Sequence, residues 1–114
     1  MNTVILTGRL TVAPEVKETS TGRKFSRFSI AVDDGFGDKK KTYFFGVTVW
    51  EKRAEFAAKY LRKGSKVILS GKLTSYEYEK DGEKRKGVDI VANEIEFAEA
   101  KKADPKQDQS DLPF

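Results

Sequence analysis

Apolar and polar side chains alternate along most of the first 50 residues, with the period of a β-strand that is buried on one face. Residues 2–10 form the first such strand, and its apolar face consists of Val4, Leu6, Gly8 and Leu10. Residues 24–32 form the second. Residues 42–50 give the strongest strand signal, because they are rich in aromatic and β-branched side chains. Residues 33–41 are rich in Gly, Asp and Lys, which predicts a loop between the second and third strands.

The period changes to that of a helix over residues 51–62, where an apolar face is formed by Ala54, Ala57, Ala58 and Leu61. Gly64 follows as a helix stop. Residues 66–79 and 85–97 return to alternation, and Asp81-Gly82 between them predicts a hairpin turn. The segment 85–97 predicts either one regular strand or a strand with a bend near Asn93. The core face predicted for the strand before it consists of Val67, Leu69, Gly71 and Leu73.

The predicted order is three strands, one helix and two strands. This order is typical of an all-β OB-fold, a five-stranded Greek-key barrel with one helix between strands 3 and 4. The apolar pattern stops at Ala100, and residues 101–111 carry no large apolar side chain. We therefore predict one domain over residues 1–99 and a disordered tail over residues 100–114.

Composition narrows the possible functions. The chain has 114 residues, and 22 Lys+Arg against 18 Asp+Glu give a net charge of +4, which permits a polyanionic partner without requiring one. Neither Cys nor His is present, which excludes disulfides and zinc–thiolate sites and removes the commonest general base. No stretch has the length of a membrane span, and the N-terminus lacks the pattern of a signal peptide. We expect a cytoplasmic protein that is not an enzyme and holds no metal or cofactor.

Several large aromatic side chains occupy positions that do not face the predicted core of the barrel. Phe44 and Trp50 lie on the face of the third strand that is opposite its aliphatic face. Tyr76 and Tyr78 lie on the face of the fourth strand that is opposite its predicted core face. Phe36 lies in the polar loop between two glycines. Because exposed aromatics reduce solubility, such a cluster indicates a contact surface.

Basic residues lie close to these aromatics in the sequence, and the two together are the working parts of a groove for single-stranded nucleic acid. A subunit interface, or aromatics packed under loops, is the alternative explanation that stays open at this point. The residues that we expect to neutralise phosphates are Lys39, Lys52, Lys63, Lys72, Arg9 and Arg27. Asp33, Asp34 and Asp38 could bind a hard cation, but their spacing is not that of a calcium loop.

Several segments together resemble the bacterial and phage single-stranded DNA-binding proteins of the OB-fold type. The matching segments are NTVILTGRL (2–10), FSIAV (28–32), the strand end Val49-Trp50 and AEFAAKYLRKGS (54–65). The last four residues, DLPF (111–114), resemble the acidic C-terminal peptide of that family. The resemblance covers nearly the whole chain.

The resemblance implies that the protein coats and protects single-stranded DNA in replication, recombination and repair. The positions of the family's base-stacking aromatics match Phe36, Phe44, Trp50 and Tyr78, and we add Tyr76 as an assisting residue. The family also implies a homotetramer with the first strand at an interface, and a location at the nucleoid, or in the host cytoplasm for a phage protein. Its C-terminal peptide, which docks replication and repair proteins, corresponds to Asp111, Leu112, Pro113 and Phe114.

Two other functions fit parts of the sequence. One is an OB-fold accessory subunit of a replication complex, whose aromatics contact a partner protein. The other is a metal-dependent nuclease that uses Asp33, Asp34 and Asp38. Titration with oligo(dT) distinguishes the first from DNA binding, and incubation of oligo(dT) with Mg²⁺ tests for cleavage by the second.

Overall fold

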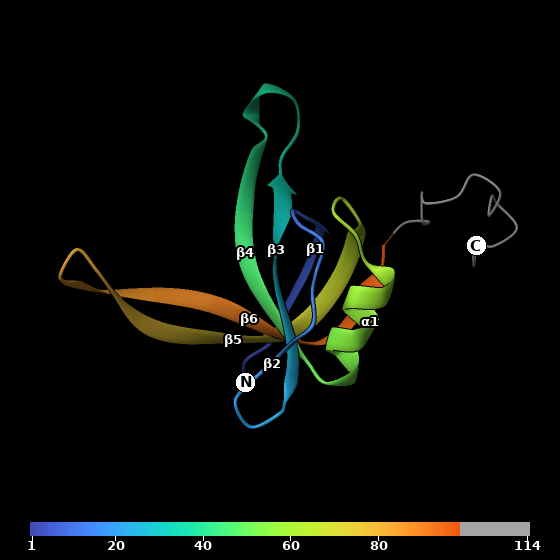
Figure 1. Ribbon diagram of the computed structural model, residues 1–114. Helices are drawn as coiled ribbons and strands as arrows, with labels where there is room; N and C mark the ends of the chain where they lie inside the picture. Colours follow the sequence, from blue (N-terminus) through green and yellow to red (C-terminus); the bar gives the residue numbers. More distant parts are fainter. Residues whose placement is uncertain (99–114) are drawn as a thin grey trace, which may run out of the picture.

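The computed structural model describes residues 1–98, in which six strands of one sheet curl into a barrel beside one helix (Figure 1). The strands are β1 (Val4–Leu10), β2 (Lys17–Glu18), β3 (Lys24–Asp34), β4 (Lys41–Trp50), β5 (Lys66–Lys80) and β6 (Glu83–Phe97). The helix α1 spans Lys52–Tyr60, and a single 3-10 turn, η1, spans Gly37–Lys39.

The strand order β1-β5-β6-β4-β3 closes into a barrel because β1 also pairs with β3, through Arg9 opposite Ala31 and Leu10 opposite Ile30. All pairings are antiparallel except that of β4 with β6. This architecture confirms the predicted OB-fold. The two-residue strand β2, which pairs with the start of β3, is an addition that alternation could not reveal because it is too short to show a period.

The core is built from the inward faces of the strands and one face of α1. Its fully buried side chains include Leu10 from β1, Ile30 from β3 and Val47 from β4. Helix α1 contributes Ala54 and Ala57, whose small side chains let the helix pack closely against the sheet. The predicted alternation therefore matches the observed burial around the barrel.

The predicted core face of β5 is wrong at Leu73, which is 44% exposed. Leu73 lies opposite Ile90, on the same side as Leu69, but from this point β5 and β6 leave the barrel as a projecting hairpin (Figure 1). Alternation assigns a side chain to a face of the sheet, and it does not say where along the strand the barrel ends.

The irregularity near Asn93 is a β-bulge. Ser70 lies opposite Glu94 and Gly71 lies opposite Ala92, so that Asn93 is an extra residue of β6. The Ser70 hydroxyl donates a hydrogen bond of 3.2 Å to Asn93 Oδ1 across the bulge. Of the two forms that the sequence allowed for the last strand, the structure shows the irregular one, and its cause is local to the pairing.

The hairpin turn between β5 and β6 is the one predicted from Asp81-Gly82. Lys80 lies opposite Glu83, and the two residues between them have φ angles of 55° and 79°. Positive φ at both central positions is the geometry of a type I′ turn, whose twist matches that of the flanking strands. The predicted tail, residues 100–114, lies outside the described residues.

The bulge makes Gly71 sensitive to substitution. A Cβ atom at Gly71 would meet the backbone oxygen of Val91 and would lie 2.7 Å from the Cα of Ala92. We predict that Gly71→Ala lowers the free energy of unfolding by about 1–3 kcal/mol, because backbone atoms must move to admit the methyl group. Thermal or urea unfolding followed by circular dichroism measures the loss. Ser75→Ala, on the exposed part of β5, is the control and should change stability by less than about 0.5 kcal/mol. Equal effects of the two substitutions would contradict the steric argument.

Candidate nucleic-acid interface

One continuous surface is formed by β3, β4, β5 and β6 on the side away from the core, here called the outer face. Strand pairing aligns its residues in rows that run across the sheet. One row joins Arg27, Thr48, Val91 and Lys72, and the next joins Ser29, Gly46, Asp89 and Thr74. The outer face therefore runs across both long hairpins, β3–β4 and β5–β6.

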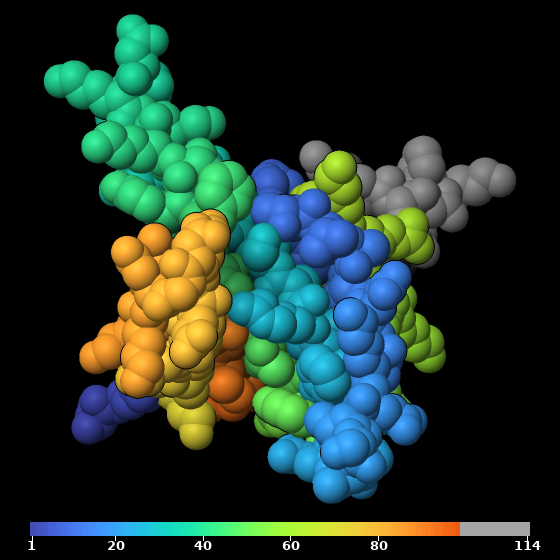
Figure 2. Space-filling view, turned by 60° about the vertical axis from the view of Figure 1, so that its left-hand side comes forward, coloured from blue at the N-terminus to red at the C-terminus, as the bar shows by residue number. Residues whose placement is uncertain are grey.

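The aromatic side chains singled out in the sequence lie on this face or at its rim. Phe44 on β4 is 66% exposed, and Tyr76 and Tyr78 on β5 are each more than two-fifths exposed, with ring centroids 5.8 Å apart. Phe36 is 88% exposed in the turn that joins β3 to β4. Figure 2 shows both hairpins standing out from the barrel on its left-hand side, so that these rings are presented on projecting arms. The site thus offers flat apolar surfaces to solvent.

Two glycines in the sheet make room for three side chains of the outer face. A Cβ at Gly87, opposite Tyr76, would lie within 2.7 Å of several atoms of the tyrosine side chain, so this side chain covers the backbone of β6 at the glycine. A Cβ at Gly46 would lie 2.7 Å from Asp89 Oδ1 and 2.8 Å from Arg27 Nη2. The glycine therefore lets these two charged side chains meet across β4.

The ion pair between Arg27 and Asp89 joins β3 to β6. Arg27 Nη2 donates to Asp89 Oδ1 at 2.7 Å, and the aspartate side chain is only 16% exposed. Arg27 was expected from the sequence to contact phosphate. In the structure its charge is balanced by a carboxylate that sequence reasoning did not single out, because only the parallel pairing of β4 with β6 brings the two residues together.

Trp50 is the least exposed of the five aromatics and has two close neighbours, one on β3 and one just before it. The ring of Phe25, its partner across the strands, lies 5.4 Å away at an angle of 40°. The guanidinium carbon of Arg23 lies 4.3 Å from the centroid of the Trp50 ring. Alternation places Phe25 on the same face as Arg27, so that Phe25 could have been found from the sequence. The approach of Arg23 could not, since this residue precedes the strand.

The basic residues predicted to bind phosphate are distributed over several parts of the structure. Lys72 lies on the outer face, beside a hollow of about 410 Å³ that it lines with Asn2 and Thr3. Lys39 lies in η1, close in sequence to Phe36. Arg9 lies at the closure of the barrel, opposite Ala31, which in turn lies opposite Phe44, and its Nη1 donates to the Gly64 oxygen at 3.0 Å. These three therefore border the aromatic surface.

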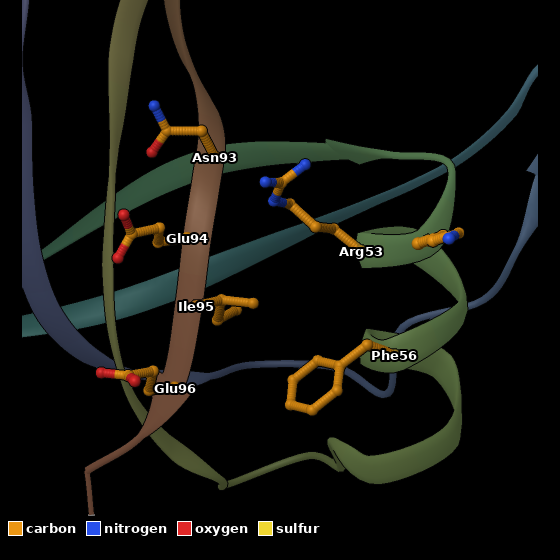
Figure 3. A pocket seen from close by; sticks show the side chains of 7 residues that line it. Arg53, Phe56, Asn93, Glu94, Ile95 and Glu96 are labelled. Atoms are coloured by element: carbon orange, nitrogen blue, oxygen red, sulfur yellow. The ribbon is translucent and has the colours of Figure 1, made fainter.

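Lys52 and Lys63 lie at the two ends of α1 rather than among the rings. Lys63 is exposed in the connection that follows the helix. Lys52 begins α1 and lines a hollow of about 420 Å³ between the helix and β6. Figure 3 shows Arg53, Phe56 and Ile95 on the facing sides of this hollow, while Glu94 and Glu96 extend from the other side of β6. Asn93 lines both this hollow and the hollow beside Lys72.

Among the acidic residues of the β3–β4 hairpin, Asp33 contacts side chains of the hairpin itself. Thr42 Oγ1 donates to Asp33 Oδ1 at 2.7 Å, and Lys40 Nζ lies 3.9 Å from Asp33 Oδ2. Within residues 1–98, no group of three or more Asp or Glu side chains is placed to hold a metal ion. In the same part of the chain, no helix is long and apolar enough to cross a membrane.

Comparison with known proteins gives the same family from sequence and from structure. The model of the single-strand binding protein family matches residues 1–98. A single-stranded DNA-binding protein of Fusobacterium nucleatum is 43% identical over 106 residues, which cover 89% of this chain and 69% of that protein. One of Clostridium tetani is 43% identical over 103 residues, which cover 87% of this chain and 71% of that protein.

A solved structure of Plasmodium falciparum SSB in complex with single-stranded DNA superimposes with a TM-score of 0.77 and 26% identity. The match covers 87% of this chain and 96% of that one. The barrel, the aromatic outer face and these matches lead to one conclusion: the chain belongs to the single-strand binding protein family.

Proposed function

We propose that this protein binds single-stranded DNA along the outer face, by stacking bases on exposed aromatic rings. The observation that carries the proposal is the exposure of four of these rings, those of Phe36, Phe44, Tyr76 and Tyr78, on two projecting hairpins. The stacking residues in this proposal are Phe36, Phe44, Trp50 and Tyr78, with Tyr76 assisting. Because every base has a flat face, such binding is largely independent of sequence.

Positive side chains are proposed to follow the DNA backbone between the rings. Lys72, Lys39 and Arg9 border the outer face and are the best-placed candidates. Arg27 lies on the face itself but shares its charge with Asp89. Lys52 and Lys63 reach phosphates only where a strand continues past the ends of α1.

The family and the names of the relatives support a role in replication, recombination and repair, in which the protein covers and protects exposed single strands. The activity is binding without catalysis, in the cytoplasm at the nucleoid or, for a phage protein, in the host.

The rival proposal is an accessory subunit whose aromatics contact a partner protein, and titration with oligo(dT) decides between this rival and DNA binding. Retention of intact oligo(dT) in the presence of Mg²⁺ would exclude the nuclease.

We further propose a homotetramer that is built through β1. This strand pairs with β5 along most of its length, whereas its other side meets β3 only at Arg9 and Leu10. The free edge before Arg9 can pair with the same edge of a second copy. Ile5 on this strand is 64% exposed and would be covered in such a contact.

The sequence after the barrel is proposed to recruit other proteins. Asp111, Leu112, Pro113 and Phe114 end the chain with two large apolar side chains near carboxylates. Such a peptide can place Phe114 in a partner's apolar pocket, while its carboxylates meet basic side chains. About a dozen residues separate it from the barrel, a span of roughly 20 Å for a flexible linker.

Stacking can be followed through Trp50, the only tryptophan of the chain. We expect strong quenching of its fluorescence as oligo(dT) is added. Trp50→Ala should weaken binding by about 1–3 kcal/mol, the usual contribution of a base–aromatic stack. Tyr60→Ala on α1 is the matched control, because it removes a ring from outside the outer face and should leave affinity unchanged. Unaltered Trp50 emission at saturating oligo(dT) would exclude this residue from the interface.

Phosphate contacts can be counted from the salt dependence of binding. For single strands, the slope of log affinity against log salt is about −0.7 per neutralised phosphate. Lys72→Gln should therefore make the slope shallower by roughly 0.7. Lys59→Gln removes the same charge from α1, where Lys59 lies over the Tyr60 ring, and should leave the slope as it is. The same change of slope in both variants would indicate a diffuse charge effect instead of a contact at Lys72.

Partner docking can be separated from DNA binding by truncation. Deletion of residues 111–114 should abolish the capture of replication and repair proteins, while affinity for oligo(dT) stays equal or rises slightly because negative charge is lost. Pull-down of purified candidate partners and an oligo(dT) titration give the two readouts. Partners that still bind the truncated protein must recognise the barrel, which would refute the docking role of the peptide.

A further inference from the structure

Arg23 covers part of the ring on which a base is proposed to stack. Its guanidinium carbon lies 4.3 Å from the centroid of Trp50, a distance at which the cation is attracted to the ring face. Arg23 Nε also donates to Glu51 Oε1 at 3.1 Å. The arginine is therefore held between the ring and a carboxylate that directly follows Trp50 in the chain.

A base that stacks on the covered face must displace the guanidinium. The displacement breaks a cation–π contact and an ion pair, so the guanidinium needs a new partner that replaces both interactions. A DNA phosphate supplies it, because guanidinium binds phosphate oxygens through two parallel hydrogen bonds. The side chains of Arg23 and Glu51 are 57% and 52% exposed, which leaves the arginine free to turn towards solvent and DNA.

Glu51 is held in place by its backbone. Its φ of 54° and ψ of −122° lie in a region that residues with a Cβ rarely adopt. Its amide donates to the Lys24 oxygen at 2.8 Å, and its own carbonyl accepts from the amides of Ala54 and Glu55 at the start of α1. A strained backbone that is fixed on both sides persists because its surroundings determine it. The carboxylate is therefore anchored next to Trp50 in the free protein.

We propose that the Glu51 carboxylate competes with DNA for Arg23. Glu51 holds Arg23 over the Trp50 ring until a DNA phosphate replaces the carboxylate as the partner of Arg23. Binding transfers Arg23 from the Glu51 carboxylate to a phosphate and uncovers the Trp50 ring for a base. Arg23 is then an additional DNA contact residue, and Glu51 is a positioning residue that acts through Arg23. This inference rests on the proposed binding of single-stranded DNA.

The pair of Lys24 with Glu55 offers a matched control. Lys24 Nζ lies 3.0 Å from Glu55 Oε1, and the side chain of Glu55 is as exposed as that of Glu51. The hydrogen bond to Glu55 raises the pKa of Lys24, so the lysine keeps its charge at neutral pH. Within residues 1–98, the ring contacts of Trp50 are with Phe25 and Arg23, and neither Lys24 nor Glu55 is among them. Glu55→Gln thus removes the same charge nearby without releasing Arg23.

The decisive measurement is the affinity for labelled oligo(dT), followed by fluorescence anisotropy so that the readout does not depend on Trp50. Glu51→Gln should tighten binding about two- to fivefold, because an exposed ion pair contributes up to about 1 kcal/mol. Glu55→Gln should leave affinity unchanged. Glu51→Gly, which suits the positive φ, removes the same carboxylate and should tighten binding to a similar extent. Circular dichroism checks that each variant is folded.

A double-mutant cycle shows whether Glu51 acts through Arg23. In an Arg23→Gln background, Glu51→Gln should no longer tighten binding, and Arg23→Gln alone should make the salt slope shallower by about 0.7. A gain that persists without Arg23, or that equals the effect of Glu55→Gln, would overturn the inference and indicate direct repulsion of DNA. Wild-type protein that fails to bind oligo(dT) would refute the proposed function itself, and this inference with it.

Discussion

The short parallel pairing of β4 with β6 joins the two long hairpins, and the arrangement of the outer face depends on it. Only three residue pairs form this contact, from Gly46 opposite Asp89 to Thr48 opposite Val91. The pairing closes the barrel on the side away from β1 and places the aromatics of β4 and β5 on one surface. Gly46 leaves space above it for the ion pair between Arg27 and Asp89, which ties β3 to β6. The same few residues thus hold the fold and define the candidate site.

The charges on the outer face are mixed. Asp89 balances Arg27, and Glu51 balances Arg23, although the partner proposed for this surface is an anion. These acids offset the positive charge of the two arginines in the free protein. They also limit the affinity for single-stranded DNA, since a phosphate must displace a carboxylate before it can bind the arginine. Such a surface suits a protein that must cover single strands and later release them.

Sequence patterns predicted the parts of the structure that depend on neighbours along the chain. Alternation gave the inward and outward faces of the strands, and Asp81-Gly82 gave the turn, because both follow from local backbone geometry. Leu73 was misplaced because the end of the barrel depends on distant strands. The partners of Arg27 and Arg23 were missed for the same reason: 62 residues separate Arg27 from Asp89, and 28 separate Arg23 from Glu51.

The hairpin of β5 and β6 reaches beyond the barrel and ends in a two-residue turn. Its outer part rests on cross-strand pairs and buries almost nothing in the core, so its length is not fixed by packing. Because side chains alternate with a period of two, lengthening both strands by two residues keeps every ring on its side, whereas one residue would turn the rings over. The length of the β5–β6 hairpin beyond the barrel can therefore change, by evolution or by design, in steps of two residues per strand. The barrel that supports the hairpin need not change with it.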